Sequence, residues 1–191
     1  RIGKGGHIVS SLAEHSAVLD TLKYLESRFG FDVTYLAPGG RGNIDPDRVR
    51  SAVREDTFLI SLMHANNETG ALTDVRAVSG IASGYGIAFH SDTVQSFGKL
   101  NLNVKELGMD MAVISAHKIS GPKGISARYI KKGTKADKYM HGGMQERDMR
   151  GGTENTAAIA GFGKAVLICR DQAGRDFEHY TELRRHLLGL L

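Results

Sequence analysis

Short apolar runs alternate with amphipathic stretches along most of the chain. The apolar runs have the length and composition of buried strands and cover residues 7–12, 31–36, 57–63, 86–90, 111–116 and 128–130. The stretches between them repeat apolar residues at helical spacing, which predicts helices at 14–29, 45–54, 74–84 and from 155 onward, with a break near 171–174. Asp45 and Pro46 have the order of an N-cap and a first helical residue. Buried strands that alternate with helices predict an α/β fold, with a mostly parallel sheet covered by helices on both faces.

Three of the predicted strands end in dense clusters of polar side chains. The clusters cover residues 64–70, 90–96 and 115–124, and they contain an aspartate, a lysine, amides and several histidines. In parallel sheets, ligands bind outside the carboxyl ends of the strands. We therefore expect the three clusters to converge on one rim and to form a site.

A metal ion is one ligand that these clusters suggest. His90 and Asp92 lie two residues apart on a predicted strand and so share one of its faces. However, the histidines do not have the spacing of a zinc motif, and a metal site would leave Lys118 without a role. The candidate metal ligands are His64, Glu68, His90, Asp92 and His117.

A covalently bound aldehyde cofactor is the other ligand, and it gives Lys118 a role. A lysine amine at a strand end can condense with an aldehyde when its pKa is lowered. Pyridoxal 5'-phosphate is the aldehyde cofactor whose remaining needs match the neighbouring residues. Those residues are Asp92 for the ring nitrogen, Gln95 for the phenolic oxygen, Ser115 and His117 for the phosphate, and His15 for stacking on the ring.

Five segments carry a resemblance to a known family. They are residues 14–20, 63–70, 90–99, 115–124 and 142–155, and together they extend over nearly the whole chain. The segments resemble the cysteine desulfurases of the class V aminotransferase family, the NifS/IscS type, which have the fold-type-I pyridoxal-phosphate architecture. The combination is specific, whereas any one segment alone would be weak evidence.

The resemblance implies a reaction and a role for each candidate residue. The family converts L-cysteine to L-alanine and leaves sulfur on the enzyme as a persulfide, for an iron–sulfur scaffold or another sulfur-acceptor protein. Lys118 is similar to the lysine that binds the cofactor and moves the Cα proton, and Asn67 to an amide near the cofactor and the substrate carboxylate. Thr153 resembles a threonine that reaches the phosphate of the neighbouring subunit, which implies a homodimer. Asp92, Gln95, Ser115, His117 and His15 keep the roles given above, with acid–base chemistry added for His15.

The resemblance also sets expectations for the extent of the chain. It implies that residues 1–191 form the large cofactor-binding domain, and that the N-terminal segment and the C-terminal small domain with the persulfide cysteine lie outside this sequence. Family members often have Gly-Ile-Gly-Ala-Leu-Tyr where residues 124–129 carry Ser126 and Arg128, so the chain departs from the family pattern at these two positions. Cys169 falls on one apolar helix stripe with Phe162 and Val166, so we expect a small buried hydrophobe rather than the sulfur acceptor.

Composition adds a few exclusions. Lys and Arg number 25 against 21 Asp and Glu, giving a net charge of +4, and no aromatic residues interleave with the basic pairs, so we expect no nucleic-acid partner. No run approaches about 18 apolar residues, so we expect no membrane partner. One cysteine in 191 residues favours a reducing compartment, the cytoplasm.

Two alternative functions stay open here: a selenocysteine lyase or other class V lyase, and a module that binds cofactor or scaffold without releasing sulfur.

Overall fold

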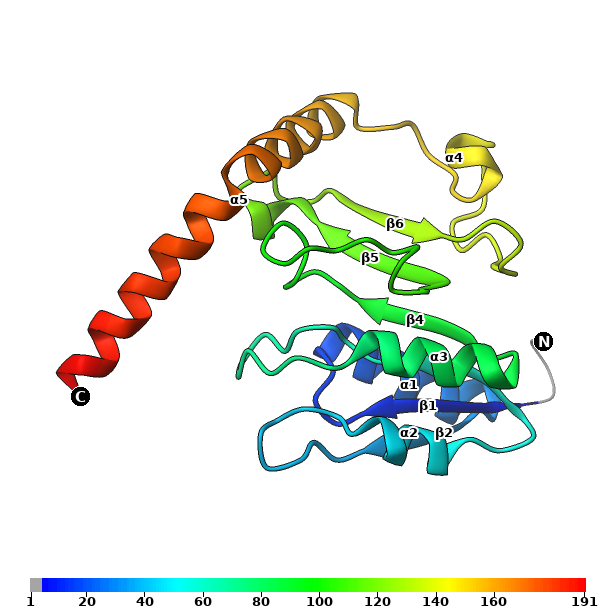
Figure 1. Cartoon of the computed structure of the whole chain (residues 1–191). Coiled ribbons are helices and arrows are strands. Elements are labelled where there is room, and N and C mark those ends of the chain that lie inside the picture. The colour runs from blue at the N-terminus through cyan, green and yellow to red at the C-terminus, as the bar shows by residue number, and fades with distance from the viewer. Residues whose placement is uncertain (1–4) are drawn as a thin grey trace. The chain divides into compact units, whose positions relative to one another are not determined.

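The computed structural model describes residues 5–191 (Figure 1). Its internal contacts divide the chain into two compact units. The first takes the chain up to Ile114 together with Ala127–Lys131, and the second takes Ser115–Ser126 and Lys132–Leu191. Each unit is described by itself, and the single domain expected over residues 1–191 stays a prediction.

The first unit is built on a six-stranded sheet with the order β2-β1-β3-β4-β5-β6. Pairing is parallel between β1 and β2, β1 and β3, β3 and β4, and β4 and β5, which confirms the mostly parallel sheet. The last residues of β5 and the first of β6 lead into and out of the second unit. The strands are β1 (His7–Ser11), β2 (Asp32–Leu36), β3 (Thr57–Ser61), β4 (Ala88–Asp92), β5 (Met111–Ser115) and β6 (Ser126–Ile130).

Capping residues and glycines set the ends of the helices in the first unit. Asp45 caps α2 by accepting a hydrogen bond from the Asp47 amide, and Pro46 is its first residue, as the sequence predicts. Gly30 ends α1 and Gly86 ends α3, both with the left-handed backbone that glycine adopts without strain. The bounds are Ser16–Phe29 for α1, Pro46–Ala52 for α2 and Val75–Tyr85 for α3.

The core of the first unit lies on both faces of the sheet, because successive residues of β1 point to opposite sides. Ile8 packs with Leu22 of α1 and Val33 of β2 in one buried cluster. Val9 packs on the other face with Val49 of α2 and with residues of α3. Helices therefore cover both faces, which confirms the layered α/β arrangement.

The second unit contains a one-turn helix, a short turn and one long helix (Figure 1). Asn155 caps the long helix by accepting a hydrogen bond from the Ala158 amide. The predicted break near 171–174 is wrong, because the helix runs unbroken through that region. Gly174 costs only about 1 kcal/mol inside a helix, and no proline interrupts the segment. The elements are η1 (Ala116–Ile119), α4 (Gln145–Asp148) and α5 (Thr156–Leu190). No helix within residues 5–191 has the length and apolarity to cross a bilayer.

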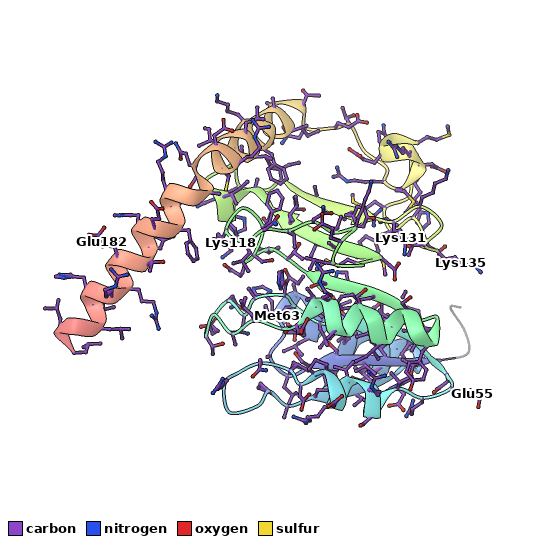
Figure 2. All side chains as sticks on the ribbon, viewed as in Figure 1. Glu55, Met63, Lys118, Lys131, Lys135 and Glu182 are labelled. Carbon is purple, nitrogen blue, oxygen red and sulfur yellow. The ribbon has the colours of Figure 1, made fainter. Side chains whose placement is uncertain are left out.

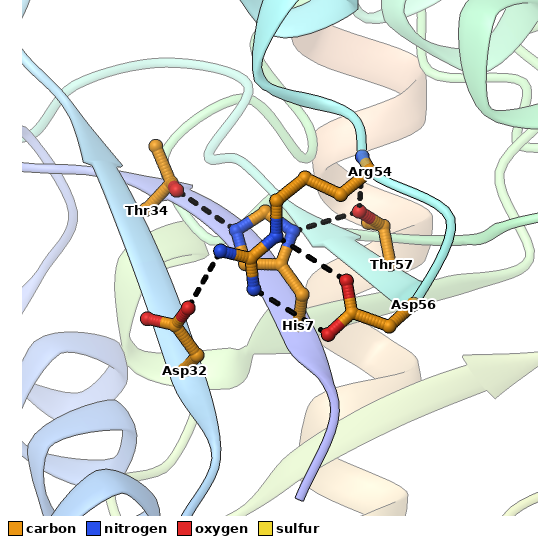
Figure 3. A network of polar contacts seen from close by, with 6 residues as sticks. All are labelled: His7, Asp32, Thr34, Arg54, Asp56 and Thr57. Atoms are coloured by element: carbon orange, nitrogen blue, oxygen red, sulfur yellow. Dashed lines mark hydrogen bonds and ion pairs between the residues drawn. The ribbon is translucent and has the colours of Figure 1, made fainter.

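A buried histidine connects three strands at the amino end of the sheet (Figure 3). His7, the first residue of β1, is 0% exposed. Its Nδ1 lies 2.7 Å from Thr57 Oγ1 on β3, and its Nε2 lies 2.8 Å from Thr34 Oγ1 on β2. Burial, and to a smaller extent the charge of Arg54, lowers the pKa of His7 from its ordinary value. The folded protein therefore favours the neutral ring.

An ion-pair group lies beside this histidine (Figure 3). The Arg54 guanidinium contacts Asp32 Oδ2 at 2.6 Å and Asp56 Oδ1 at 3.2 Å. All three side chains are well exposed, so these pairs add little to stability on their own. Their main effect is to join the start of β2 to the segment that leads into β3.

The His7 network predicts a stability loss in acid. The pKa of His7 is depressed in the folded state, so the stability it contributes is present above the unfolded value of 6.5 and is lost as pH falls through the folded value. We expect His7→Gln, which cannot take up the proton, to lose less unfolding free energy than the native protein between about pH 7.5 and about pH 5.5. Urea denaturation across that range measures the difference. The exposed His186→Gln serves as control, and an equal acid slope for native and His7→Gln proteins contradicts the prediction.

Candidate active site

The candidate residues are distributed over both units. The convergence of the two groups on one rim stays a prediction. The first unit holds His15, Asn67, Asp92 and Gln95, and the second holds Ser115, His117, Lys118 and Thr153.

Asp92 is the last residue of β4 and is firmly held at the carboxyl end of the sheet. Its Oδ1 accepts a hydrogen bond of 2.9 Å from the Val94 amide, and its backbone carbonyl accepts one of 2.9 Å from the His64 amide. The side chain is half-buried. A carboxylate fixed in this way at a strand end is suited to hold a protonated heterocycle nitrogen or another cation.

Gln95 lies in the turn that follows Asp92 and is half-buried. Its Oε1 accepts a hydrogen bond of 3.2 Å from Lys99 Nζ. Because Oε1 already accepts this hydrogen bond, the NH₂ group of the side chain is the part that can donate to a ligand. A donor is what the phenolic oxygen of the expected cofactor needs.

His15 is the N-cap of α1, so its ring is already in use. Nδ1 accepts a hydrogen bond of 3.1 Å from the Ala17 amide, and the side chain is exposed. A neutral imidazole that accepts at Nδ1 carries its proton on Nε2. Nε2 is therefore the nitrogen of His15 that is available for proton transfer.

Glu14, next to His15, is a buried carboxyl that the sequence analysis missed. It is 6% exposed, and its Oε1 accepts hydrogen bonds of 2.9 Å from Ser11 Oγ and of 2.9 Å from the Met63 amide. Its Oε2 is buried without a hydrogen-bond partner among the described residues. Burial, together with the nearby charge of Asp92, raises the pKa of Glu14 to about 7. No local pattern signals this burial, because the contact that creates it comes from the end of β3.

Asn66, and not Asn67, organises the loop after β3. Asn66 Nδ2 donates to the Ala13 carbonyl at 2.8 Å, and its Oδ1 accepts from the amides of Glu68 and Thr69 at 3.0 and 2.8 Å. Asn67 is exposed and donates to Glu68 Oε1 at 2.8 Å. Two adjacent asparagines thus have different tasks: one shapes the loop, and the other keeps its amide at the surface.

The histidines of the metal hypothesis bind serines. His64 Nδ1 lies 2.9 Å from Ser96 Oγ, and His90 Nδ1 lies 2.9 Å from Ser61 Oγ. Burial lowers the pKa of both rings, which favours neutral imidazoles in these contacts. Within residues 5–191, no group of three or more His, Cys, Asp or Glu side chains is arranged to hold a metal ion. The structure therefore gives the metal hypothesis no support.

In the second unit, Lys118 lies on the one-turn helix η1 (Figure 2). Ala116 and Ile119 of this turn are buried, while His117 and Lys118 are exposed. The turn therefore uses its apolar residues as anchors and presents the lysine amine to solvent. Ser115 Oγ lies 2.8 Å from His117 Nδ1, so a hydroxyl and an imidazole lie together in the residues directly before Lys118.

Glycines allow this lysine turn to pack tightly against α5. A Cβ on Gly121 would lie 2.9 Å from the Ala116 carbonyl oxygen and 3.2 Å from Ala165 Cβ. A Cβ on Gly161 would lie 2.7 Å from Pro122 Cγ. All three distances are below ordinary contact, so these positions have no room for a side chain. The close approach fixes the backbone that carries Lys118.

The second unit also holds the candidate Thr153 and the cysteine Cys169, which the sequence excludes as the sulfur acceptor. Thr153 is exposed in the loop before α5. Cys169 lies on α5 and is half-buried, whereas the apolar stripe predicts a fully buried side chain. Phe162 of the same stripe is buried, and Ile159, one helical turn before it, is 43% exposed, so the apolar stripe is covered only in part.

Comparison with known proteins decides the family. The sequence matches the family described as Aminotransferase class-V over residues 1–191. The chain belongs to this family. This class V aminotransferase chain is 48% identical over 185 residues to the cysteine desulfurase IscS of Dictyoglomus turgidum, covering 97% of the chain and 47% of that protein. It therefore spans about half the length of the curated relatives it matches.

Solved structures agree with the class V assignment and with the fold. A NifS-like protein superposes with a TM-score of 0.93 at 38% identity, covering 97% of this chain and 51% of the other. A structure described as SspA in complex with cysteine superposes with a TM-score of 0.85 at 43% identity, covering 87% of this chain and 48% of the other. The resemblance to NifS/IscS-type proteins is thus confirmed in sequence and in structure.

The glycine contacts of this class V chain predict opposite effects for two similar substitutions on α5. We expect Gly161→Ala to lower the unfolding free energy by about 1–3 kcal/mol, because its new methyl group overlaps the Pro122 ring. Gly163→Ala adds the same methyl group where nothing lies within 4 Å, so the gain in helix preference should stabilise by about 0.5–1 kcal/mol. Urea denaturation of the full-length variants tests both. Equal effects of the two substitutions would show that the close approach is not needed.

Proposed function

We propose that the protein containing this chain is a pyridoxal 5'-phosphate-dependent cysteine desulfurase. It would convert L-cysteine to L-alanine and leave the sulfur as an enzyme persulfide. The observation that carries the proposal is an exposed lysine on the turn directly after β5, in a chain whose neighbouring strand β4 ends in a fixed carboxylate. Relatives named cysteine desulfurase IscS, and a structural neighbour in complex with cysteine, support this choice of substrate.

The path of the chain supports one site made from both groups of residues. Asp92 pairs in register with Val113 of β5, and Lys118 follows Val113 by five residues. The carboxyl ends of adjacent parallel strands lie at the same edge of a sheet, where ligands of this architecture bind. We therefore assign Asp92 and Lys118 to opposite ends of one cofactor ring.

The chemistry of the donor set fits the cofactor. Lys118 supplies the primary amine for the aldehyde, Asp92 a carboxylate for the ring nitrogen, and the Ser115–His117 pair suits the phosphate. The remaining assignments are Gln95 to the phenolic oxygen, His15 to the ring face, Asn67 to the region near the substrate carboxylate, and Thr153 to the phosphate in the neighbouring subunit of a homodimer.

When bound, the cofactor withdraws electrons from the Cα of the substrate through its protonated ring. The negative charge of the Asp92 carboxylate stabilises the protonated form of the ring nitrogen. Lys118 Nζ takes the Cα proton and returns it in the course of the reaction. We assign proton donation to His15 Nε2, which carries the ring proton while Nδ1 caps α1.

The sulfur acceptor and the cellular setting are part of the same proposal. We assign sulfur acceptance to a cysteine other than Cys169, because Cys169 is half-buried in the middle of a long helix and lacks the mobile tether that the role needs. We place the enzyme in the cytoplasm, with an iron–sulfur scaffold or another sulfur-acceptor protein as its partner.

Trapping the cofactor tests the role of Lys118. In the full-length protein, reduction with borohydride in the presence of pyridoxal 5'-phosphate should fix the cofactor to Lys118, as mass spectrometry of the digested protein would detect. Lys118→Ala should lose this adduct, whereas Lys123→Ala, which removes an exposed lysine of the same segment, should keep it. An equal adduct in native and Lys118→Ala proteins would refute the assignment.

Substitution of Asp92 tests the other end of the site. We expect Asp92→Asn to reduce alanine formation from L-cysteine by about 10²-fold or more, because a neutral amide does not hold the ring nitrogen protonated. Cofactor binding itself should survive, since the other contacts remain. Asp20→Asn changes an exposed aspartate that pairs with Lys23 on the surface of α1 and should leave turnover unchanged. Near-native turnover of Asp92→Asn would disprove the proposed role.

A further inference from the structure

The Glu14 carboxyl connects the ends of two strands of the first unit. Glu14 lies just after β1, and one of its oxygens binds both the Ser11 hydroxyl at the end of β1 and the Met63 amide beyond the end of β3. The next residue after Met63, His64, donates its own amide to the Asp92 carbonyl at the end of β4. Two successive backbone amides therefore connect the Glu14 carboxyl to the strand end that carries Asp92.

A second contact holds the same segment from its other side. Asn66 donates to the Ala13 carbonyl, immediately before Glu14. His15, immediately after Glu14, is bound to the Ala17 amide at the start of α1. The turn from Ala13 to His15 is thus fixed at each of its three residues, and Glu14 supplies the central, buried contact.

The position uses a carboxyl where a neutral acceptor would satisfy the same donors. Both hydrogen bonds go to Oε1, while Oε2 is buried and unpartnered among the described residues. A buried polar atom without a partner is costly, so a merely structural contact would favour a smaller side chain. The groups that act on Glu14 are the Ser11 hydroxyl from β1, the Met63 amide just beyond the end of β3 and the Asp92 carboxylate from β4.

We propose that Glu14 is a positioning residue of the cofactor site: it sets the turn that carries His15 against the strand end that carries Asp92, and it exchanges its proton according to whether a cation occupies Asp92. This inference rests on the proposed function, because the cation is the protonated ring nitrogen of the cofactor. Glu14 is not a catalytic residue in this scheme, since it acts through His15 and Asp92.

The link between the two carboxyls follows from their charges. Burial is the main cause of the raised pKa of Glu14, and the field of an ionised, uncompensated Asp92 adds to it and further favours the protonated form. A cation bound at Asp92 cancels that field, so Glu14 then gives up its proton more readily. By reciprocity, loss of the Glu14 proton strengthens cation binding at Asp92 by the same factor. Cofactor affinity should therefore increase as pH rises through the titration of Glu14.

Infrared difference spectroscopy of the full-length apoprotein tests the proton on Glu14. The native protein should lose one protonated-carboxyl band as pH rises through about 7, and added 4'-deoxypyridoxine phosphate, which keeps the ring nitrogen but lacks the aldehyde, should move that midpoint to lower pH. Glu14→Gln should lack the band, while Glu55→Gln, an exposed control, should retain it. A band that persists in Glu14→Gln, or a midpoint that the ligand leaves unmoved, overturns the link.

The dissociation constant of pyridoxal 5'-phosphate tests positioning. Glu14→Gln keeps an oxygen for Ser11 and Met63, so at about pH 6 its affinity should stay within about threefold of native, whereas Glu14→Ala should weaken binding about tenfold. Between about pH 6 and about pH 8, the native affinity should improve about fivefold more than that of Glu14→Gln. Equal pH profiles of native and Glu14→Gln proteins overturn the inference even if Glu14→Ala fails to fold. Failure of the native protein to bind the cofactor would instead refute the proposed function.

Discussion

The parallel pairing of β4 with β3 on one side and β5 on the other is the constraint on which the first unit depends. Ile60 of β3 is paired with Phe89 of β4, and both are 0% exposed. A shift of this pairing by one residue would turn Phe89 to the opposite face of the sheet, so apolar packing fixes the register. The same register brings the His64 amide to the Asp92 carbonyl. Core packing thereby determines where a functional carboxylate stands.

Most of the fold could be predicted from the sequence because strands and helices alternate with clear patterns. All six expected strands and the helices around them form, and Asp45 with Pro46 starts α2 as its chemistry requires. The long helix α5 was the exception. Asp171 and Gly174 weaken a helix locally, but their cost is small beside the hydrogen bonds that continuous helix supplies on each side.

The candidate site could be predicted only where function leaves a local trace. Polar residues at or just after the ends of strands, such as Asp92 and Lys118, stand out because packing alone gives no reason for them. Glu14 leaves no such trace, since its burial depends on Met63, 49 residues away in the sequence. The difference between Asn66 and Asn67 is also invisible in sequence, because the backbone of the loop decides which amide points inward.

Buried titratable groups near the two ends of β1 favour uncharged forms for the same reason. His7 begins the strand with its pKa lowered by burial, and Glu14, just past its end, has a pKa raised by burial to about 7. Both groups are neutral together only between the depressed value of the histidine and the raised value of the glutamate. Within that pH range, neither of these two buried side chains carries a charge.

The tight packing of the lysine turn on α5 determines how Lys118 can move. With Gly121 and Gly161 in close approach to their neighbours, the main chain of the turn has little freedom to slide or tilt. The amine nevertheless sits at the tip of a flexible four-carbon stem. The backbone of Lys118 is therefore fixed while its side chain is flexible. The positions that the amine can reach are set by rotations about the side-chain bonds and not by movement of a loop.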